Sequence, residues 1–403
     1  MEAVDVVIIG GGIAGASAAY FLARLGVRDV LVLERSSVAA GASGRASGLV
    51  AFLAASHPGQ ATLLKASADF YAAWEEQIGG LSAITRVGAL LPVGAADAPA
   101  LAHEVAIMCD AGHDTRLIGR DEVAALVPAW YLDDVAAAAY SPCSGYIDPP
   151  SVTTALMNRA RALGVRVYQG ATVRAIEMRG GRVASVVSDR GAIAAPVVVI
   201  AAGAWSASIG HLVGATLEVR PVRHQVAHLR PPADLPYPFP VCSDDHNRLY
   251  FRPEPGGLVT VTNGGAEDYP DALLGDADPD RFDPSASAWY GRWTRRQMAR
   301  RVPAMVDAEI VGGHAGVYAT GPDGYPLLGP LREAEGLYCL CDTGGNGLTT
   351  GPGLGRALAE TIVRGRTFTD IRLFRPSRFA EGAPIAAAYR HTHADPPVPW
   401  DRD

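Results

Sequence analysis

The residue spacing with the clearest chemical meaning is a glycine cluster at residues 10–15, with the pattern G-x-G-x-x-G. An almost uninterrupted apolar run, residues 4–9, precedes it and predicts a buried strand. An alanine-rich segment, residues 13–25, follows and predicts a helix. Glycines at such a turn let the backbone approach a pyrophosphate, which then meets the unpaired N–H groups of the helix. The cluster therefore predicts a dinucleotide site with contacts at Gly10, Gly12, Ile13, Ala14 and Gly15.

Glu34 ends the next predicted strand, residues 30–33. A carboxylate there suits the hydroxyls of an adenosine ribose and disfavours a 2′-phosphate. The cluster alone does not separate FAD from NAD. A second glycine-rich segment, residues 41–48, and a glycine-rich loop between a strand and a helix near the C-terminus both fit a flavin, whose ring system needs close backbone on several sides. We expect FAD, with an NAD-dependent dehydrogenase as the alternative.

Composition narrows the class of protein. The chain has 403 residues, enough for two domains, and a net charge of −7 without a basic stretch, which excludes nucleic acid and anionic membranes as expected partners. No apolar run approaches the roughly 18 residues of a membrane span, and no secretory signal is visible, so we expect a cytoplasmic protein. The five cysteines are scattered, which predicts neither a disulfide framework nor a metal site. Lys65 is the only lysine, so chemistry that needs a lysine must use it or be absent.

Hydrophobic patterns place the remaining elements. Helices are expected over 60–78, 151–163 and 352–363, and further strands over 165–168, 172–177, 183–188, 197–201 and 336–341. Alternating residues such as 248–252 predict an antiparallel sheet within 215–310.

Five segments of the chain carry a family resemblance: residues 7–35, 41–50, 145–177, 197–225 and 314–355. They resemble the D-amino-acid oxidase superfamily of FAD-dependent oxidoreductases, and within it the branch of sarcosine oxidase, dimethylglycine dehydrogenase and the FAD subunit of L-proline dehydrogenase. The resemblance implies an α/β fold, α+β overall, in which a doubly wound Rossmann-like FAD domain joins a second domain built on a large mixed, mainly antiparallel sheet. The implied FAD domain comprises 1–85, 145–215 and 312–380; the substrate domain comprises 86–144 and 216–311; and 381–403 forms a C-terminal tail.

The resemblance also assigns cofactor contacts. Glu34 and Arg35 match the adenosine contacts, and Val173 matches a position whose backbone meets adenine. The stretch under the pyrophosphate and flavin corresponds to Ser43, Gly44, Arg45, Ala46, Ser47, Gly48 and Leu49. The segment near the ribityl chain corresponds to Ala202, Gly203 and Trp205. The loop beside the pyrimidine edge of the flavin corresponds to Gly344, Gly345, Asn346, Gly347, Leu348 and Thr349.

Several positions depart from the family pattern. Arg45 stands where some relatives attach FAD through a histidine, and Gly316 stands where others use a cysteine, so non-covalent FAD is expected. Val259 replaces a lysine that activates oxygen, which leaves O2 or another electron acceptor open. Val50 and Thr349 replace basic residues that grip a substrate carboxylate.

The implied reaction oxidises a C–N bond of a secondary or N-methylated amine, an amino acid or a cyclic imino acid, by hydride transfer to flavin N5, and yields an imine. The expected substrate-facing residues are Tyr318, Tyr250 and Arg252, with Arg252 as a ligand for a carboxylate. Arg223, His224 and His314 are further candidates, each with a structural role as the alternative. Two other hypotheses remain: an FAD-holding subunit that needs a partner subunit, and a tailoring amine oxidase with a larger substrate.

Overall fold

A six-stranded sheet carries the glycine cluster. In the computed structural model, which describes residues 2–264 and 278–386, this sheet is parallel except for β20 at one edge. Its order is β10 (Arg166–Gln169), β3 (Val30–Glu34), β2 (Val6–Ile9), β14 (Val197–Ile200), β21 (Leu337–Cys341) and β20 (Leu327–Pro330).

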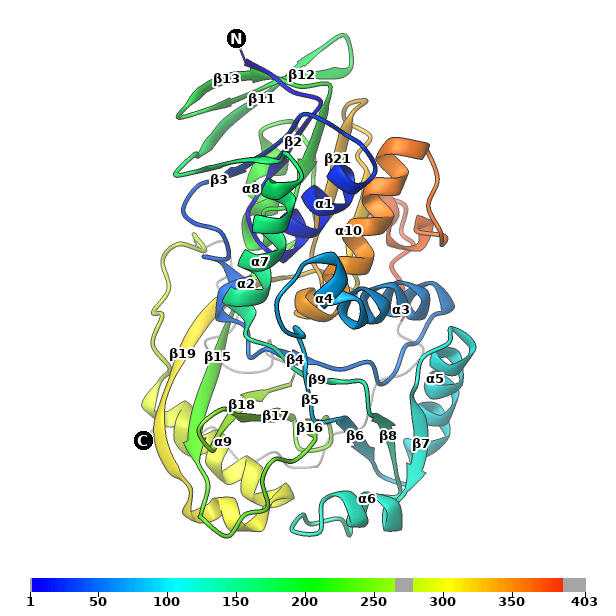
Figure 1. Cartoon of the computed structure of the whole chain (residues 1–403), viewed down its shortest axis with the longest axis vertical. Helices are drawn as coiled ribbons and strands as arrows, with labels where there is room; N and C mark the ends of the chain where they lie inside the picture. The colour runs from blue at the N-terminus through cyan, green and yellow to red at the C-terminus, as the bar shows by residue number, and fades with distance from the viewer. Residues whose placement is uncertain (1, 265–277, 387–403) are drawn as a thin grey trace.

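The two faces of this sheet are covered differently (Figure 1). Side chains alternate along β2, so that Val6 and Ile8 join one core while Val7 and Ile9 join another. The first core is closed by α1 (Ile13–Arg24), α3 (Pro58–Ala72), α7 (Pro149–Ala162) and α10 (Gly347–Arg364). The second is closed largely by a four-stranded sheet of β1 (Glu2–Ala3), β13 (Gly191–Ala194), β12 (Arg182–Ser188) and β11 (Val173–Arg179). The result is a Rossmann-like layer between helices and a small sheet.

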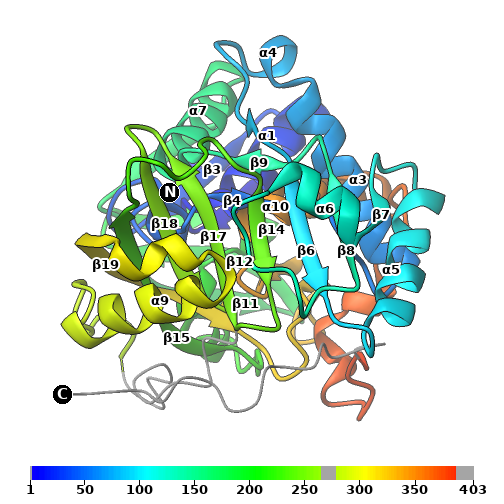
Figure 2. The same cartoon turned by 90° about the horizontal axis from the view of Figure 1, so that it is seen from below.

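An eight-stranded mixed sheet forms the other half of the molecule. Its neighbours pair antiparallel except β16 and β6, which are parallel. Helix α9 (Ala288–Arg301) lies across one face (Figure 2), and α5 (Ala98–Asp110) and α6 (Arg120–Leu126) flank the far end. The order is β19 (Glu309–Thr320), β15 (Arg220–Arg230), β18 (Leu258–Asn263), β17 (Leu249–Glu254), β16 (Val241–Asp244), β6 (Ala89–Val93), β8 (Ala137–Ser141) and β7 (Arg116–Gly119).

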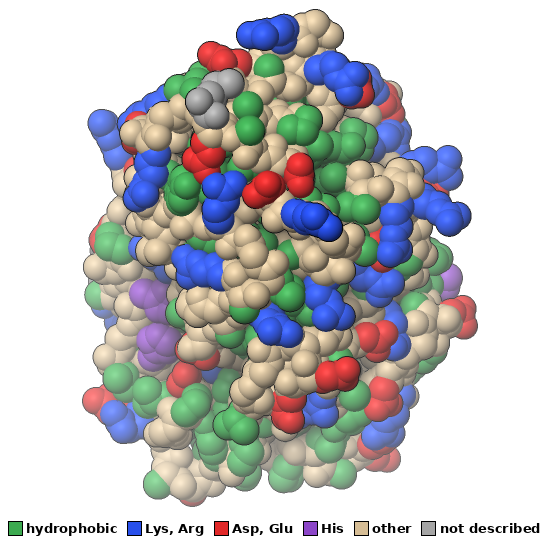
Figure 3. Space-filling model, turned by 45° about the horizontal axis from the view of Figure 1, so that its top comes forward, with side chains coloured by type: hydrophobic (Ala, Val, Ile, Leu, Met, Phe, Trp, Pro, Cys, Tyr) green, Lys and Arg blue, Asp and Glu red, His purple; other side chains and the backbone are tan. Residues whose placement is uncertain are grey.

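Short elements join the two halves. A three-stranded sheet of β4 (Leu49–Val50), β9 (Gly145–Tyr146) and β5 (Thr85–Arg86) lies between them, next to the short helix α2 (Ala42–Arg45). The remaining described helices are α4 (Trp74–Gln77), α8 (Ser206–His211) and the 3₁₀ turns Gly203–Trp205, Pro303–Asp307, Arg372–Phe374 and Pro376–Arg378. Basic and acidic side chains intermingle on the face seen in Figure 3.

A buried ion-pair network fixes the start of the β16–β17 turn. The Arg301 guanidinium donates from Nε to Oδ2 of Asp244 at 2.7 Å and from Nη1 to Oδ1 of Asp134 at 2.7 Å. Arg301 and Asp244 are almost fully buried, so removing either partner leaves the other charge in a low-dielectric interior. This network ties α9 to the strand that ends beside the small cavity described below.

The sequence predicts most of these elements, with strand ends shifted by at most two residues. Two helix predictions are wrong in extent. The helix expected over 60–78 is α3 followed by α4, with a break at Ala73. The helix expected from Pro352 is α10, which begins at Gly347. Pro352 lacks the N–H that would bond to the carbonyl of Leu348, and that carbonyl instead accepts a hydrogen bond from the Tyr71 hydroxyl at 2.5 Å.

Two of the expected domain limits, at residues 312 and 381, can be compared with the structure. The limit at residue 312 falls inside β19, which pairs along its length with β15 in the eight-stranded sheet. Of the expected tail, residues 387–403 lie outside the described part of the chain. Ile385 is buried, and its N–H donates to Oδ2 of Asp323 at 2.9 Å, so the tail begins packed against the Rossmann-like layer. None of the described helices is long and apolar enough to cross a membrane.

Candidate active site

The large cavity, about 520 Å³, opens where β2, β3, β14 and β21 end. The carboxyl ends of parallel strands meet at this edge, which is where α/β folds bind dinucleotides. Of the residues expected to contact the cofactor, those that line it are Gly10, Gly12, Ile13, Ala14, Glu34, Arg35, Ser43, Arg45, Ala46, Val173, Ala202, Gly203, Trp205, Gly345, Gly347 and Leu348.

The glycine turn at the floor of the large cavity leaves no room for side chains. Gly10 has a φ of +117°, and a Cβ there would lie 2.4 Å from the carbonyl oxygen of Ala201. A Cβ on Gly15 would lie 2.0 Å from the carbonyl oxygen of Gly10, so Gly15 serves helix–strand packing rather than the cavity wall. Gly44 likewise packs against the backbone of Ala39 and does not line the cavity.

Polar groups already orient this turn. Glu34 accepts hydrogen bonds from the N–H of Gly11 at 2.7 Å and of Ser36 at 2.8 Å. The Ser43 hydroxyl accepts the N–H of Ile13 at 2.9 Å, at the first turn of α1. The backbone cradle therefore presents a helix N-terminus and a carboxylate at separate places along one cavity, which fits the phosphates and a ribose of a dinucleotide.

Asp342 is a buried acid in the wall of the large cavity that the sequence interpretation missed. It follows β21 directly, is 1% exposed, and has a left-handed φ of +49°. Its Oδ1 accepts the N–H of Gly344 at 3.2 Å, and its Oδ2 is buried. Burial raises the pKa of this carboxyl to about 7. Its place after a central parallel strand is the signal that predicts such a residue.

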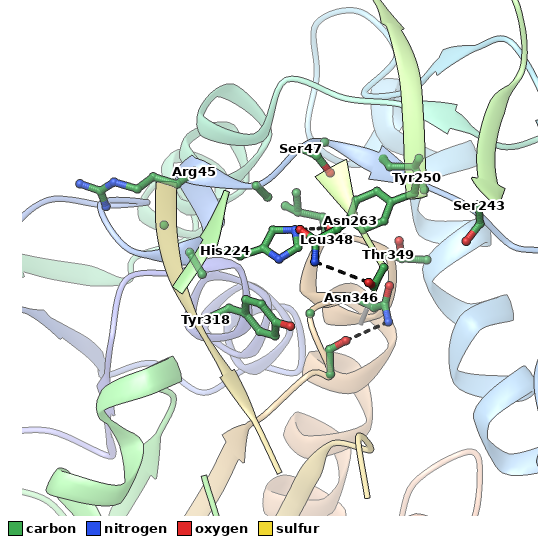
Figure 4. A pocket seen from close by; sticks show the side chains of 18 of the residues that line it. Arg45, Ser47, His224, Ser243, Tyr250, Asn263, Tyr318, Asn346, Leu348 and Thr349 are labelled. Carbon is green, nitrogen blue, oxygen red and sulfur yellow. Dashed lines mark hydrogen bonds between the residues drawn. The ribbon is translucent and has the colours of Figure 1, made fainter. Parts of the chain in front are cut away.

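The small cavity, about 300 Å³, lies beside the large one and shares part of its wall with it (Figure 4). The shared residues are Ala42, Arg45, Ala46, Tyr318, Gly345 and Leu348. Ser47, Gly48, Leu49, Gly344, Asn346 and Thr349, all expected near the cofactor, line the small cavity only. The sequence interpretation did not identify Ser243, Asp245 and Asn263, which also line it.

Three strands of the eight-stranded sheet place an aromatic cluster in the small cavity: His224 from β15, Tyr250 from β17 and Tyr318 from β19 (Figure 4). The Tyr250 hydroxyl lies 2.7 Å from Nε2 of His224, and the two rings stack with centroids 5.9 Å apart. The Tyr318 ring meets His224 edge-on at 5.5 Å. Nε2 of His224 also contacts the Thr262 hydroxyl.

His224 and Tyr250 are uncharged at neutral pH. Burial, with His314 as a second cause, lowers the pKa of His224 to about 4. Burial raises the pKa of Tyr250 to about 12. Among the described lining residues, Arg45 is the permanent cation, but its guanidinium donates to the carbonyl of Ala40 and points away from the cluster (Figure 4).

The structure does not bring Arg252 into either cavity. Its buried guanidinium pairs with Glu254 at 2.7 Å, donates to the carbonyl of Ser47, and lies 4.8 Å from the centroid of the Tyr146 ring. All of these contacts are internal, so Arg252 fastens β17 to the stretch after α2.

Other candidates also lie outside the cavities. The buried Arg223 side chain donates to the carbonyl oxygens of Asp283 and Ser285. His314 contacts the carbonyl of Arg45 at 3.1 Å, and Lys65 pairs with Asp69 on α3. Among the described residues, no group of three or more His, Cys, Asp and Glu side chains is arranged to hold a metal ion.

Comparison with known protein families identifies the class of protein to which this chain belongs. Residues 5–361 match the family described as FAD dependent oxidoreductase. The chain therefore belongs to this family of flavin-dependent oxidoreductases.

Individual proteins with similar sequences or structures are also oxidoreductases by name. The human mitochondrial dimethylglycine dehydrogenase is 29% identical over 402 residues, covering 94% of this chain and 44% of the relative. The formaldehyde-forming 4-methylaminobutanoate oxidase of Paenarthrobacter nicotinovorans is 29% identical, covering 94% and 46% respectively. The chain thus spans less than half the length of these two relatives. The crystal structure of L-proline dehydrogenase from P. horikoshii has the same fold, with a TM-score of 0.85, 23% identity and coverage of 94% and 99%.

Proposed function

We propose that this chain binds FAD non-covalently in the large cavity and oxidises, in the small cavity, the C–N bond of a secondary or N-methylated amine, an amino acid or a cyclic imino acid. The observation that carries the proposal is the wall shared by the two cavities, at Ala46, Tyr318 and Gly345 among others. A substrate beside the aromatic cluster of the small cavity would lie against the cofactor within the protein interior.

The proposed cofactor contacts are the expected residues that line either cavity. Glu34 and Arg35 would hold the adenosine end, and the first turn of α1 would face the pyrophosphate. The start of α10, from Gly347, would place backbone donors and the positive end of a helix where negative charge develops on reduction. When bound, FAD supplies the acceptor for the hydride.

The His224, Tyr250 and Tyr318 side chains position the amine. Only a neutral amine gives up hydride readily, and the uncharged His224 and Tyr250 side chains offer no counter-charge to an ammonium ion. The Tyr250 hydroxyl is held by His224, and Tyr318 limits the width of the cavity on the cofactor side. Loss of hydride from the carbon leaves an iminium ion, and release of its N–H proton to water gives the imine, which water hydrolyses to a carbonyl compound and an amine.

The choice of substrate class rests on the charges around the small cavity. Arg252 is fastened elsewhere, Arg45 points away, and Thr349 carries no charge, so no described arginine or lysine is presented for a carboxylate. The names of two relatives, dimethylglycine dehydrogenase and 4-methylaminobutanoate oxidase, denote N-methylated substrates, which supports an N-methyl amine.

An anaerobic substrate screen tests the proposal. Purified protein is mixed with pairs of compounds, each an N-methyl or cyclic amine and its dealkylated primary amine, and loss of flavin absorbance near 450 nm is followed (an approximate wavelength for flavins). At least one secondary amine is expected to bleach the flavin while its primary partner does not. Flavin that stays oxidised with every amine would make the substrate class wrong. Bleaching only after a co-purifying polypeptide is added would instead support an FAD-holding subunit. Repeating the productive reaction in air and measuring peroxide separates O2 from another acceptor.

A further inference from the structure

A loop from the eight-stranded sheet reaches across to the large cavity. Residues 278–287, here named the strap, precede α9 and run beside β19 toward the end of β3 (Figure 1). Asp280 and Phe282 of the strap line the large cavity, although the rest of that lining comes mainly from the Rossmann-like layer. No sequence pattern predicts this, because the strap has neither helical nor strand periodicity.

The second half of the strap is firmly attached to the eight-stranded sheet. The buried Arg223 guanidinium donates to the carbonyl oxygens of Asp283 at 3.1 Å and Ser285 at 2.7 Å. The N–H of Ala315 on β19 donates to Pro284 at 2.7 Å, and the N–H of Ser287 donates to Oε1 of Gln225 at 2.7 Å. These contacts set the position from which the first half extends over the cavity.

The first half of the strap is tied to the Rossmann-like layer by one ion pair. Both terminal nitrogens of Arg35 donate to the Asp280 carboxylate, with Nη1 to Oδ2 at 2.5 Å. The same guanidinium lies 4.3 Å from the centroid of the Trp205 ring, so it is held between Trp205 and Asp280. Hydrogen bonding from Arg35 lowers the pKa of Asp280 below its ordinary value. All three residues line the cavity at the end that Glu34 marks.

We propose that Arg35, Asp280 and Phe282 form a clasp that retains the dinucleotide, with the strap closing the adenosine end of the cavity. Arg35 then has two functions, since it both borders the adenosine end and locks the strap over it. Phe282, half-buried, supplies an apolar wall on the same side. This inference rests on the proposed non-covalent binding of FAD in the large cavity and not on the identity of the substrate.

The clasp predicts that cofactor retention depends on salt. The Arg35 and Asp280 side chains are 39% and 44% exposed, so dissolved ions screen their attraction. The Phe282 contact is apolar and is not screened. Loss of the ion pair and loss of the aromatic ring therefore give different salt profiles.

The test measures the rate at which FAD leaves the holoprotein, from the rise of flavin fluorescence after dilution, at low and high KCl. In wild type the rate is expected to rise with salt. Asp280→Asn is expected to release FAD about fivefold faster at low salt, the ratio that corresponds to ~1 kcal/mol, and to lose most of the salt dependence. Phe282→Ala is expected to release FAD faster at both salt concentrations. Arg35→Gln with Asp280→Asn should be no faster than the faster single variant.

Controls distinguish the clasp from a general loss of stability. Glu122→Gln removes a partly exposed ion pair with Arg116 at the far end of the eight-stranded sheet and should release FAD as wild type does. Far-UV circular dichroism and the melting temperature of each variant show that it is folded. A folded Asp280→Asn protein with the wild-type rate and salt dependence would overturn the clasp. Flavin retained by every variant at every salt concentration would overturn it as well. The assay needs no substrate, so it can fail or succeed independently of the amine screen.

Discussion

Gly316 and Arg45 face each other across the wall of the small cavity. A Cβ built on Gly316 would lie 2.9 Å from Cβ and 3.4 Å from Cδ of Arg45. The family resemblance matches these two positions to a histidine and a cysteine through which some relatives attach FAD, and here neither residue is a histidine or a cysteine. The absence of a side chain at 316 is what leaves room for Arg45.

Replacing Gly316 by cysteine should therefore destabilise the protein rather than create a flavin link. Overpacking of this kind costs about 1–3 kcal/mol, and the melting temperature should fall accordingly. Arg45→Gly in the same chain removes the opposing Cβ, so the double variant should recover part of the loss. Gly316→Cys with an unchanged melting temperature would contradict the packing seen here.

The flavin should be released completely by acid. Precipitation of the purified holoprotein with trichloroacetic acid is expected to leave all of the yellow colour in the supernatant, because Arg45 and Gly316 lack the imidazole or thiol that would bond covalently to the flavin. Colour in the washed pellet would show a covalent link and would make the non-covalent proposal wrong.

His224 and Tyr250 should set the rate of anaerobic flavin reduction. His224→Ala is expected to lower it by about 10²-fold, the loss that a misplacement of the substrate by about 1 Å can cause. Tyr250→Phe, which removes one hydrogen bond to His224, is expected to lower it by about tenfold. Tyr140→Phe in β8, outside both cavities, is the matched control and should react at the wild-type rate.

The pH dependence of the flavin reduction rate distinguishes titration of the substrate amine from titration of the enzyme. Because the pKa of His224 is lowered to about 4, this residue is neutral from pH 5 upward. A fall of the reduction rate between pH 9 and 6 should then follow the amine pKa of the substrate or the pKa of Asp342, and the contribution of the substrate should move when a less basic amine is used. An acid limb that stays fixed for amines of different basicity would assign it to the enzyme.

Asp342 should make the apoprotein less stable as the pH rises. In the folded state its pKa is raised to about 7 from an ordinary 3.8, so between those values the folded chain holds a proton that the unfolded chain has lost. Its contribution is complete below about pH 4 and is lost as the pH passes through 7. Asp342→Asn should flatten the fall in unfolding free energy measured by urea denaturation over pH 4.5–7.5, while Asp5→Asn at the surface should not. An unaltered slope in Asp342→Asn would refute this role.

Local patterns explain how much the sequence predicts. The apolar run before Gly10 and the acid that ends β3, Glu34, lie within one βαβ unit. Their spacing alone therefore predicts that both lie at the dinucleotide site. Tyr318 was expected near the flavin and Tyr250 on a strand face of the second domain, and β19 and β17 place these two side chains in the small cavity.

Residues outside regular patterns show what the sequence cannot give. Arg252 has the charge to bind a substrate carboxylate, but its partners in the structure are Glu254 and the Ser47 carbonyl. Tertiary packing, which the sequence does not show, determines these partners. Asp280 reaches Arg35 across 245 residues of chain through a loop without periodicity. Such contacts depend on how the two sheets face each other, which no local spacing records.

The most direct test of the central claim is an anaerobic titration of the holoprotein with the best amine from the screen. We predict that one equivalent of a secondary or N-methylated amine bleaches one equivalent of bound flavin and yields one equivalent of carbonyl product, formaldehyde in the case of an N-methyl group. A flavin that no amine bleaches, or a purified protein that carries no flavin and instead uses NAD, would contradict the claim.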